Sequence, residues 1–291
     1  MNLLLPTVDD PLHLRKMTWQ DLPAVHRLSS LVGWSHRPED WQFMFQSGQG
    51  WIAEIHGRIV GCALYWLWGS SAATVGMVIV SPDWQGKRIG FLVMEKIMSC
   101  LEGYQVRLHA TAMGKGLYQK FGFKDAGIVT QYLSNPLPKI QPCNIPEPLS
   151  VRLAYPSDKE TLTALDYLST GLLRTELIEQ ILTDGIKTIV LLDKHQQIIG
   201  FAGYRNFGRG VIIGPVAASN IEQAKVLISQ FFSDAAGLVL RIDITDNAPL
   251  ARWLEDLGFT PVSIPIVMYK GRRPAEKRQC STFAIVTQAL G

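Results

Sequence analysis

The longest uncharged segment of the chain lies in its first third. No Asp, Glu, Lys or Arg stands between Ile59 and Pro82, and a segment of that length is long enough for a membrane-spanning helix. However, Gly69-Ser70-Ser71 stands in its middle, and this composition is typical of a turn. The two halves, residues 59–68 and 72–81, are rich in β-branched and aromatic residues. The pattern therefore predicts a buried β-hairpin and no membrane span.

Apolar periodicity and capping residues predict a series of elements around this hairpin. Thr18 followed by Asp21 is typical of a helix N-terminus, and Pro38 suits the first turn of a second helix. The expected order is a strand at 12–15, helices at 18–31 and 38–46, strands at 51–55, 58–68 and 72–81, a helix at 90–101, a strand at 106–111, a helix at 114–121 and a final strand pair.

The chain repeats this pattern once, which predicts two similar modules in tandem. Residues 58–65 resemble residues 197–204, and residues 117–123 resemble residues 253–259. Between the modules, residues 136–149 contain five prolines, which exclude a helix interior and favour an extended connector. The predicted domains are a first module at 1–135, a proline-rich connector at 136–149 and a second module at 150–291.

The second module repeats the order of elements with losses. Its last predicted strand, at 282–290, either completes the second module or pairs across the modules. The expected elements are strands at 151–154, 187–192, 197–204 and 210–218, helices at 158–168 and 174–182, and a helix from about Ile221.

Composition excludes several classes of function. The net charge of +3 is too small to predict nucleic-acid binding. The four cysteines form no Cys-x-x-Cys pair and indicate free thiols in a reducing cytoplasm. The six histidines have no ligand spacing, so we expect no metal. A basic segment followed by a long apolar one is missing at the N-terminus, so we expect no signal peptide.

Residues 77–90 read as a strand, a glycine-containing loop and the start of an amphipathic helix. Such a loop presents backbone N–H groups at a helix N-terminus, where the macrodipole favours an anion such as a pyrophosphate. The loop is neither a P-loop nor a dinucleotide-binding fingerprint, because the chain contains neither Gly-x-x-x-x-Gly-Lys-Ser/Thr nor Gly-x-Gly-x-x-Gly after a strand.

The segment resembles the acetyl-CoA signature of the GNAT superfamily of N-acetyltransferases, Gln/Arg-x-x-Gly-x-Gly/Ala after a strand. Gln85 and Gly90 match, whereas Arg88 stands where the family usually has its first Gly. Further on, Leu117-Tyr118 with Gly122-Phe123 resembles the family's Leu-Tyr-x-x-x-Gly-Phe element. The two motifs stand in the family's order, and residues 33–41 resemble a two-module bacterial subfamily.

The resemblance implies an α/β (α+β) fold with two tandem GNAT-like modules, each a mixed, mostly antiparallel central sheet flanked by helices. In the family the fourth and fifth strands splay apart and the pantetheine amides pair with the freed backbone. The residues so implied to bind acetyl-CoA are Val78, Ile79, Val80, Gln85, Gly86, Lys87, Arg88, Ile89, Gly90 and Thr111.

Tyr118 matches the family's general acid, which protonates the departing thiolate. The base stays open between His36, His109, Glu54 and water. Trp34, His36 and Glu54 are the candidate acceptor-binding residues, although at least two of Trp34, Trp41, Trp66 and Trp68 are expected in the core. In the second module the phosphate loop is missing and Leu254 replaces the acid, so this module is interpreted as a degenerate, substrate-shaping partner.

The implied function is acetyl transfer from acetyl-CoA to a primary amine of a small molecule or peptide by direct attack. The alternatives are a non-catalytic acyl-CoA-binding regulator and a scaffold that binds no coenzyme. The expected protein is cytoplasmic, a monomer or homodimer, with no nucleic-acid, membrane or metal partner, and the identity of the acceptor amine is open.

Overall fold

The computed structural model describes residues 12–271 and 280–291. The chain divides into two compact units that do not coincide with the two modules of the sequence. The first unit holds the described residues up to Trp66 together with Val75–Gly103. The second unit holds the hairpin tip Leu67–Thr74 and the described residues from Tyr104 onward.

The sheet of the first unit contains the predicted hairpin. Its strands lie in the order β1 (His13–Lys16), β2 (Gln49–Ile55), β3 (Arg58–Trp68) and β4 (Ala72–Val80). Strand β2 pairs antiparallel with both β1 and β3. The uncharged segment thus forms two adjacent strands, and no helix in the described part of the chain is long and apolar enough to cross a membrane.

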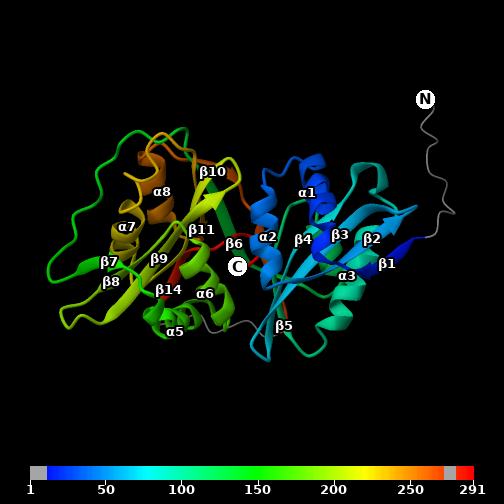
Figure 1. Cartoon of the computed structure of the whole chain (residues 1–291), viewed down its shortest axis with the longest axis horizontal. Helices are drawn as coiled ribbons and strands as arrows, with labels where there is room; N and C mark the ends of the chain where they lie inside the picture. The colour runs from blue at the N-terminus through cyan, green and yellow to red at the C-terminus, as the bar shows by residue number, and fades with distance from the viewer. Residues whose placement is uncertain (1–11, 272–279) are drawn as a thin grey trace. The chain divides into compact units, whose positions relative to one another are not determined.

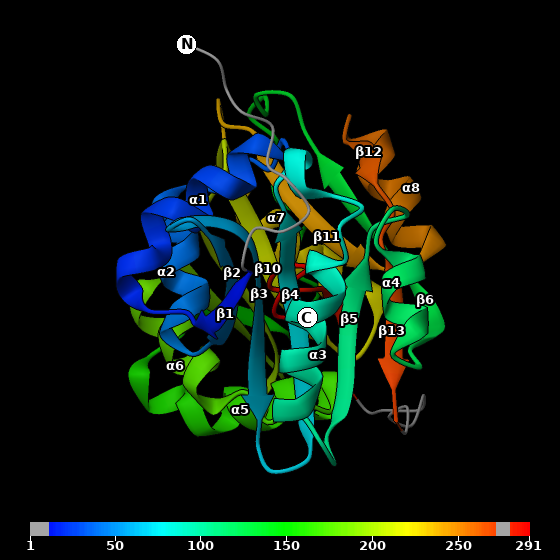
Figure 2. The ribbon, with the colours of Figure 1, turned by 90° about the vertical axis from the view of Figure 1, so that its right-hand side faces the viewer.

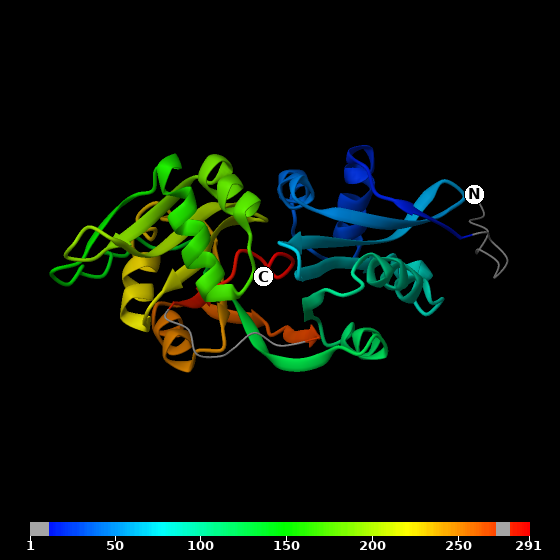
Figure 3. The same ribbon diagram turned by 90° about the horizontal axis from the view of Figure 1, so that it is seen from below.

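Helices cover both faces of this sheet. Helices α1 (Leu22–Leu31) and α2 (Pro38–Gln46) lie on one face, and α3 (Ile89–Cys100) lies on the other (Figure 3). The indole of Trp41 donates to Ser29 Oγ at 3.1 Å, and that of Trp66 donates to the Met44 carbonyl at 2.8 Å. Both indoles are fully buried, so they belong to the core as expected for at least two of the four tryptophans, with their N–H groups satisfied.

The sheet of the second unit is larger and mixes strands from both sequence modules. Its order is β5-β13-β6-β11-β14-β10-β9-β8-β7, with β12 paired to β6. These strands are β5 (Gln105–Ala110), β6 (Lys124–Leu133), β7 (Ser150–Leu153), β8 (Lys187–Leu192), β9 (Ile198–Phe207), β10 (Gly210–Ala218), β11 (Leu240–Thr245), β12 (Thr260–Ser263), β13 (Ile266–Lys270) and β14 (Ser281–Ala284).

The prediction that the first module ends in its own pair of strands is wrong. After helix α4 (Lys115–Lys120) the chain forms one long strand, β6, and the strand between β5 and β6 is β13 from the second module (Figure 2). Strand β13 pairs antiparallel with both neighbours, Val267 opposite His109 on β5 and Gly127 on β6. A strand supplied from over a hundred residues away leaves no local signal at residues 122–135, because sheet pairing is not restricted to neighbours in sequence.

Helices also cover both faces of the second sheet (Figure 1, Figure 3). They are α5 (Lys159–Thr170) and α6 (Thr175–Asp184) on one face, and α7 (Ile221–Ser229) and α8 (Ala248–Asp256) on the other. The connector forms no helix or strand over residues 138–149. It packs on this unit: Ile140 and Ile145 are partly buried against its core, and the Cys143 amide donates to Ser229 Oγ at 2.9 Å.

The internal repeat is confirmed by one polar arrangement that occurs twice. Arg15 donates to Asp21 at 2.8 Å, and Asp21 accepts from the backbone of Thr18. In the second module Arg152 donates to Asp158 at 2.7 Å, and Asp158 accepts from the backbone N–H of Tyr155. In both cases a short strand is bound to the start of the next helix, as expected for two copies of one folding unit.

Candidate active site

The last part of β4 is preceded by a backbone irregularity. Met77 has φ of 54°, a left-handed conformation that is rare for a non-glycine residue inside a strand. Its carbonyl accepts from Cys62 Sγ at 3.5 Å. The residues implied to pair with pantetheine, Val78, Ile79 and Val80, follow directly.

The loop from Gln85 to Arg88 is exposed and leads into α3. Gly86 and Arg88 both have positive φ, 78° and 61°, and Arg88 is the N-cap of the helix. The first helical bond there runs from the Leu92 amide to the Arg88 carbonyl at 3.0 Å. The preceding amides of a helix start have no intrahelical acceptor, so they are donors for an anion.

Side chains hold this loop in shape. Gln85 Nε2 donates to the Val80 carbonyl at 3.2 Å, which ties the loop to the end of β4. Lys87 Nζ lies 4.4 Å from the centre of the Trp84 ring, and the Arg88 guanidinium lies 5.4 Å from that of Phe91. Two cations therefore stand beside the free amides, and these residues fit a pyrophosphate.

Tyr118 is buried on α4 and packs edge-on against Phe123, with ring centres 6.2 Å apart. A methyl group at Gly114 would lie 3.1 Å from Tyr118 Cε2 and 3.3 Å from Thr111 Oγ1. The glycine thus allows the tyrosine ring and Thr111 to lie close together. Burial raises the pKa of the Tyr118 phenol well above its usual range, so the phenol holds its proton at neutral pH.

The candidate acceptor residues of the first unit have other contacts. His36 lies between two indoles, 5.6 Å from Trp34 and 6.4 Å from Trp41 between ring centres. Glu54 accepts from Arg15 Nε at 3.0 Å, in an ion pair that also includes Asp21. The structure therefore places Trp34 and His36 together and Glu54 elsewhere in the first unit, and their acceptor role stays a prediction.

The second unit contains a pocket of about 500 Å³ beside β5. Arg107 and His109, on one face of β5, line it together with Tyr269 on β13, Asp246 at the end of β11 and Thr170 on α5. His109 Nδ1 lies 2.7 Å from the Gln288 carbonyl and donates to it. Burial, together with the nearby Arg107 charge, lowers the pKa of His109 to about 3. His109 is therefore neutral at physiological pH and a poor base for an amine.

The C-terminal strand completes the second module, because β14 pairs with β10 and β11 of that module. Strands β10 and β11 correspond in order to β4 and β5, and they pair in parallel only from Val211 to Ile213. Beyond this point β14, shorter than the predicted strand at 282–290, lies between them and pairs with Ala217 of β10 and Ile244 of β11. A Cβ at Gly214 would overlap the Ile285 carbonyl. The chain's own backbone thus fills the gap between these two strands.

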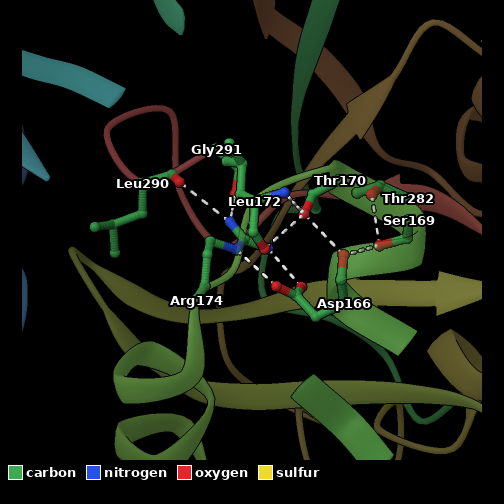
Figure 4. A network of polar contacts seen from close by, with 8 residues as sticks. All are labelled: Asp166, Ser169, Thr170, Leu172, Arg174, Thr282, Leu290 and Gly291. Atoms are coloured by element: carbon green, nitrogen blue, oxygen red, sulfur yellow. Dashed lines mark hydrogen bonds and ion pairs between the residues drawn. The ribbon is translucent and has the colours of Figure 1, made fainter. Parts of the chain in front are cut away.

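A buried polar network anchors the same C-terminal segment (Figure 4). Arg174 and Asp166 form an ion pair with side chains 0% and 1% exposed, through Nε at 2.8 Å and Nη2 at 2.6 Å. The Arg174 Nη1 group donates to the Leu290 carbonyl at 3.1 Å and also to that of Gly291. Each nitrogen of this guanidinium therefore has an acceptor on α5 or on the C-terminal segment.

Sequence reasoning missed Arg107, Asp166 and Arg174. The alternation of polar and apolar residues over 105–110 was a usable signal, because it places Arg107 and His109 on the same face of one strand. Arg174 had no such signal, since its partners lie on α5 and more than a hundred residues further along the chain. Among the described residues, no group of three or more His, Cys, Asp or Glu residues is arranged to hold a metal ion.

Comparison with known proteins finds two domain matches in the chain. Residues 46–125 match one family described as an acetyltransferase (GNAT) domain, and residues 162–284 match a second family with the same description. Together the two matches cover more than half of the chain. A Bacillus subtilis protein, the uncharacterized N-acetyltransferase YitH, is 26% identical over 286 residues, which span 96% of this chain and 98% of the relative.

Solved structures have the same fold. A putative acetyltransferase from Pyrococcus horikoshii superposes with a TM-score of 0.77 at 20% identity, covering 96% of each chain. A tandem GNAT protein from the clavulanic acid biosynthesis pathway superposes with a TM-score of 0.64 at 13% identity, covering 91% of this chain and all of the other. At these identities the likeness concerns the fold, which confirms a mixed, largely antiparallel architecture flanked by helices.

Proposed function

Because the chain belongs to the GNAT superfamily of acyltransferases, with two GNAT domains in tandem, we propose that it transfers an acetyl group from acetyl-CoA to a primary amine of a small molecule or peptide. Members of this superfamily use acetyl-CoA generally. The observation that carries the proposal is the exposed loop from Gln85 to Arg88, which presents free amides and two cations at the start of α3.

The first module would hold acetyl-CoA. The amides at the start of α3, with Lys87 and Arg88, suit the pyrophosphate. The backbone of Val78, Ile79 and Val80 suits the pantetheine amides, because it follows the irregularity at Met77. One amide in this stretch would also stabilise the oxyanion. The remaining residues proposed for this role are Gln85, Gly86, Ile89, Gly90 and Thr111.

When bound, acetyl-CoA supplies the thioester whose carbonyl carbon the amine attacks. The protein's part is to keep a proton ready for the sulfur as its bond to carbon breaks. Tyr118 holds that proton, because burial raises its pKa, and regains one from solvent after transfer. His109 is too weakly basic to remove the amine proton. We therefore propose that the amine loses its proton to water.

The second module supports the site without binding coenzyme. It has no counterpart of the Gln85–Gly90 loop between β10 and α7, and β14 fills the gap between β10 and β11. We propose that it shapes the acceptor pocket, with catalysis assigned to residues 1–135, the connector to 136–149 and the supporting module to 150–291. The four free cysteines suit the cytoplasm.

Tyr118→Phe tests this function, because it keeps the ring packing and removes only the proton. We expect kcat to fall by roughly 100- to 10,000-fold with unchanged affinity for acetyl-CoA. Tyr132→Phe is the matched control, since it removes another buried phenol, one that donates to Glu255 at 2.8 Å. Turnover is detected as free coenzyme A over a broad panel of amines.

An unchanged kcat in Tyr118→Phe, with chemistry shown to be rate-limiting, would contradict the acid role. Binding of acetyl-CoA without turnover on any amine would instead identify an acyl-CoA-binding regulator. A chain that binds no acetyl-CoA would contradict the proposed function as a whole.

A further inference from the structure

Helix α4, which carries Tyr118, is a short crossover between β5 and β6 within the second unit. The Thr111 carbonyl accepts from the Gly114 amide at 3.0 Å, and the Gly114 carbonyl accepts from the Tyr118 amide at 3.4 Å. At the other end the Tyr118 carbonyl accepts from the Phe123 amide at 3.2 Å, directly before β6. Backbone hydrogen bonds therefore connect Tyr118 to the end of β5 and to the start of β6, and its place depends on where these strands lie.

Strands β5 and β6 are joined through a third strand. Both pair antiparallel with β13, whose first residue, Ile266, lies opposite Ala110 on β5 and Ile128 on β6. Ala110 is also the last residue of β5, and Thr111 follows it. The end of β5 that leads into α4 therefore lies at the end of the strand that β5 shares with β6.

One residue of the C-terminal segment bridges β5 and β6 at this end. The Gln288 carbonyl accepts from His109 Nδ1 at 2.7 Å, and the Gln288 side-chain amide donates to Gln131 Oε1 at 3.0 Å. His109 stands two residues before Thr111, and Gln131 lies on β6 beyond the part that pairs with β13. Gln288 thus adds a connection between the two strands where β13 ends.

The bridge is itself anchored on both sides of Gln288. The Val286 carbonyl accepts from Arg205 Nη2 at 2.9 Å, and the Leu290 carbonyl accepts from Arg174 Nη1 at 3.1 Å. Both arginines are buried, and hydrogen bonds from a charged donor are stronger than those between neutral groups. The position of Gln288 is therefore fixed by strand β9 and helix α6, independently of β5.

We propose that Gln288 is a positioning residue for the general acid, because through His109 and Gln131 it fixes the end of β5 against β6 and thereby holds Tyr118 in place. The proposal rests on the proposed function and gives the second module a part in it, since that module supplies Gln288. It also gives the neutral imidazole of His109 a role other than proton removal. A displacement of about 1 Å at a catalytic group can cost on the order of 100-fold in rate.

Kinetics of the whole chain test the bridge. His109→Leu removes the donor to Gln288 and should lower kcat by roughly 10- to 100-fold with unchanged affinity for acetyl-CoA. His109→Asn should restore most of kcat, because an asparagine amide presents an N–H close to the position of Nδ1; asparagine is no base, so this rescue separates positioning from proton removal. Thr245→Val is the matched control, since it removes a hydrogen bond of 2.8 Å to the Thr282 carbonyl of the same segment from β11, and should leave kcat unchanged.

The side-chain half of the bridge gives a second test that keeps the backbone contacts of the segment. Gln131→Leu and Gln288→Leu break the same hydrogen bond. Each should lower kcat, and the double variant should fall no further than the single ones. If His109→Leu does not fold, these variants carry the test. An unchanged kcat in both single variants would then overturn the proposal.

Hydrogen exchange gives a readout that needs no turnover. The amides of residues 114–121 should exchange at least 10-fold faster in His109→Leu than in the wild type, and at the wild-type rate in Thr245→Val. Unchanged kcat and exchange in His109→Leu, or a His109→Asn variant as slow as His109→Leu, would overturn the proposal. A wild-type chain that acetylates no amine contradicts the proposed function instead, and exchange in α4 then decides whether the bridge holds the helix.

Discussion

Replacing Arg174 by Met tests how the C-terminal segment is held. The substitution keeps an unbranched side chain of similar length and removes the guanidinium from a site where its side chain is 0% exposed. Asp166, 1% exposed, would then keep a carboxylate without its cation. The carbonyls of Leu290 and Gly291 would lose their donor at the same time.

The magnitude follows from this burial. Removing one partner of a buried ion pair costs about 3–5 kcal/mol, because the remaining charge is uncompensated. Arg152→Met is the matched control, since Arg152 donates to Asp158 in a pair whose side chains are 31% and 11% exposed. An exposed pair contributes about 0–1 kcal/mol. We therefore expect Arg174→Met to be the more destabilising substitution by about 3 kcal/mol.

Equilibrium unfolding in urea measures both free energies. The double variant Asp166→Leu/Arg174→Met adds a second test, because it leaves no buried charge and should recover part of the loss. Two results would refute the reasoning. One is a loss of unfolding free energy below about 1 kcal/mol in Arg174→Met. The other is a double variant whose unfolding free energy is lower than that of Arg174→Met.

Two further substitutions give independent checks. His109 has a pKa of about 3 when folded against 6.5 for the free side chain, so below pH 6.5 the unfolded chain binds the additional proton. Its contribution to stability is complete above that pH and falls by up to about 1.4 kcal/mol per pH unit as the pH is lowered toward the folded pKa. His109→Gln should remove this part of the slope in unfolding free energy between pH 7 and pH 5, and an unchanged slope would contradict the burial of a neutral imidazole. At Arg88, whose φ is 61°, Arg88→Val should be less stable than Arg88→Gly by at least about 1 kcal/mol in the same urea assay, because a β-branched residue tolerates this conformation poorly; equal stabilities would show that the loop adopts another backbone conformation.

Local patterns predicted the parts of the molecule that are local in sequence. The hairpin of β3 and β4 followed from two apolar runs around a turn, and the start of α3 followed from the glycine-containing loop before it. The strand between β5 and β6 could not be predicted in this way, because β13 comes from residues 266–270 and its pairing depends on the whole sheet. For the same reason the pattern showed a strand near residue 282 without showing that it fills the gap between β10 and β11.

The candidate site also contains residues that local sequence predicted and residues that it did not. Motif spacing pointed to Tyr118 and to the loop from Gln85 to Gly90, whose residues are close in sequence. The surroundings of Arg107 are set in space by the Tyr269 hydroxyl, 3.4 Å from its Nη1 atom, and by Gly291 against its guanidinium, and local sequence shows neither neighbour. Residues that act through distant partners thus become visible only once the fold is known.

The central claim is that acetyl-CoA binds once per chain, at the loop before α3. Isothermal titration of the whole chain with acetyl-CoA tests it most directly, with Gly90→Glu placing an anion at the start of α3 and Ser219→Glu placing one just before α7 as the matched control. The account predicts one equivalent bound by the wild type and by Ser219→Glu, and a large loss of affinity in Gly90→Glu. Two equivalents in the wild type, or normal binding by Gly90→Glu, would contradict it.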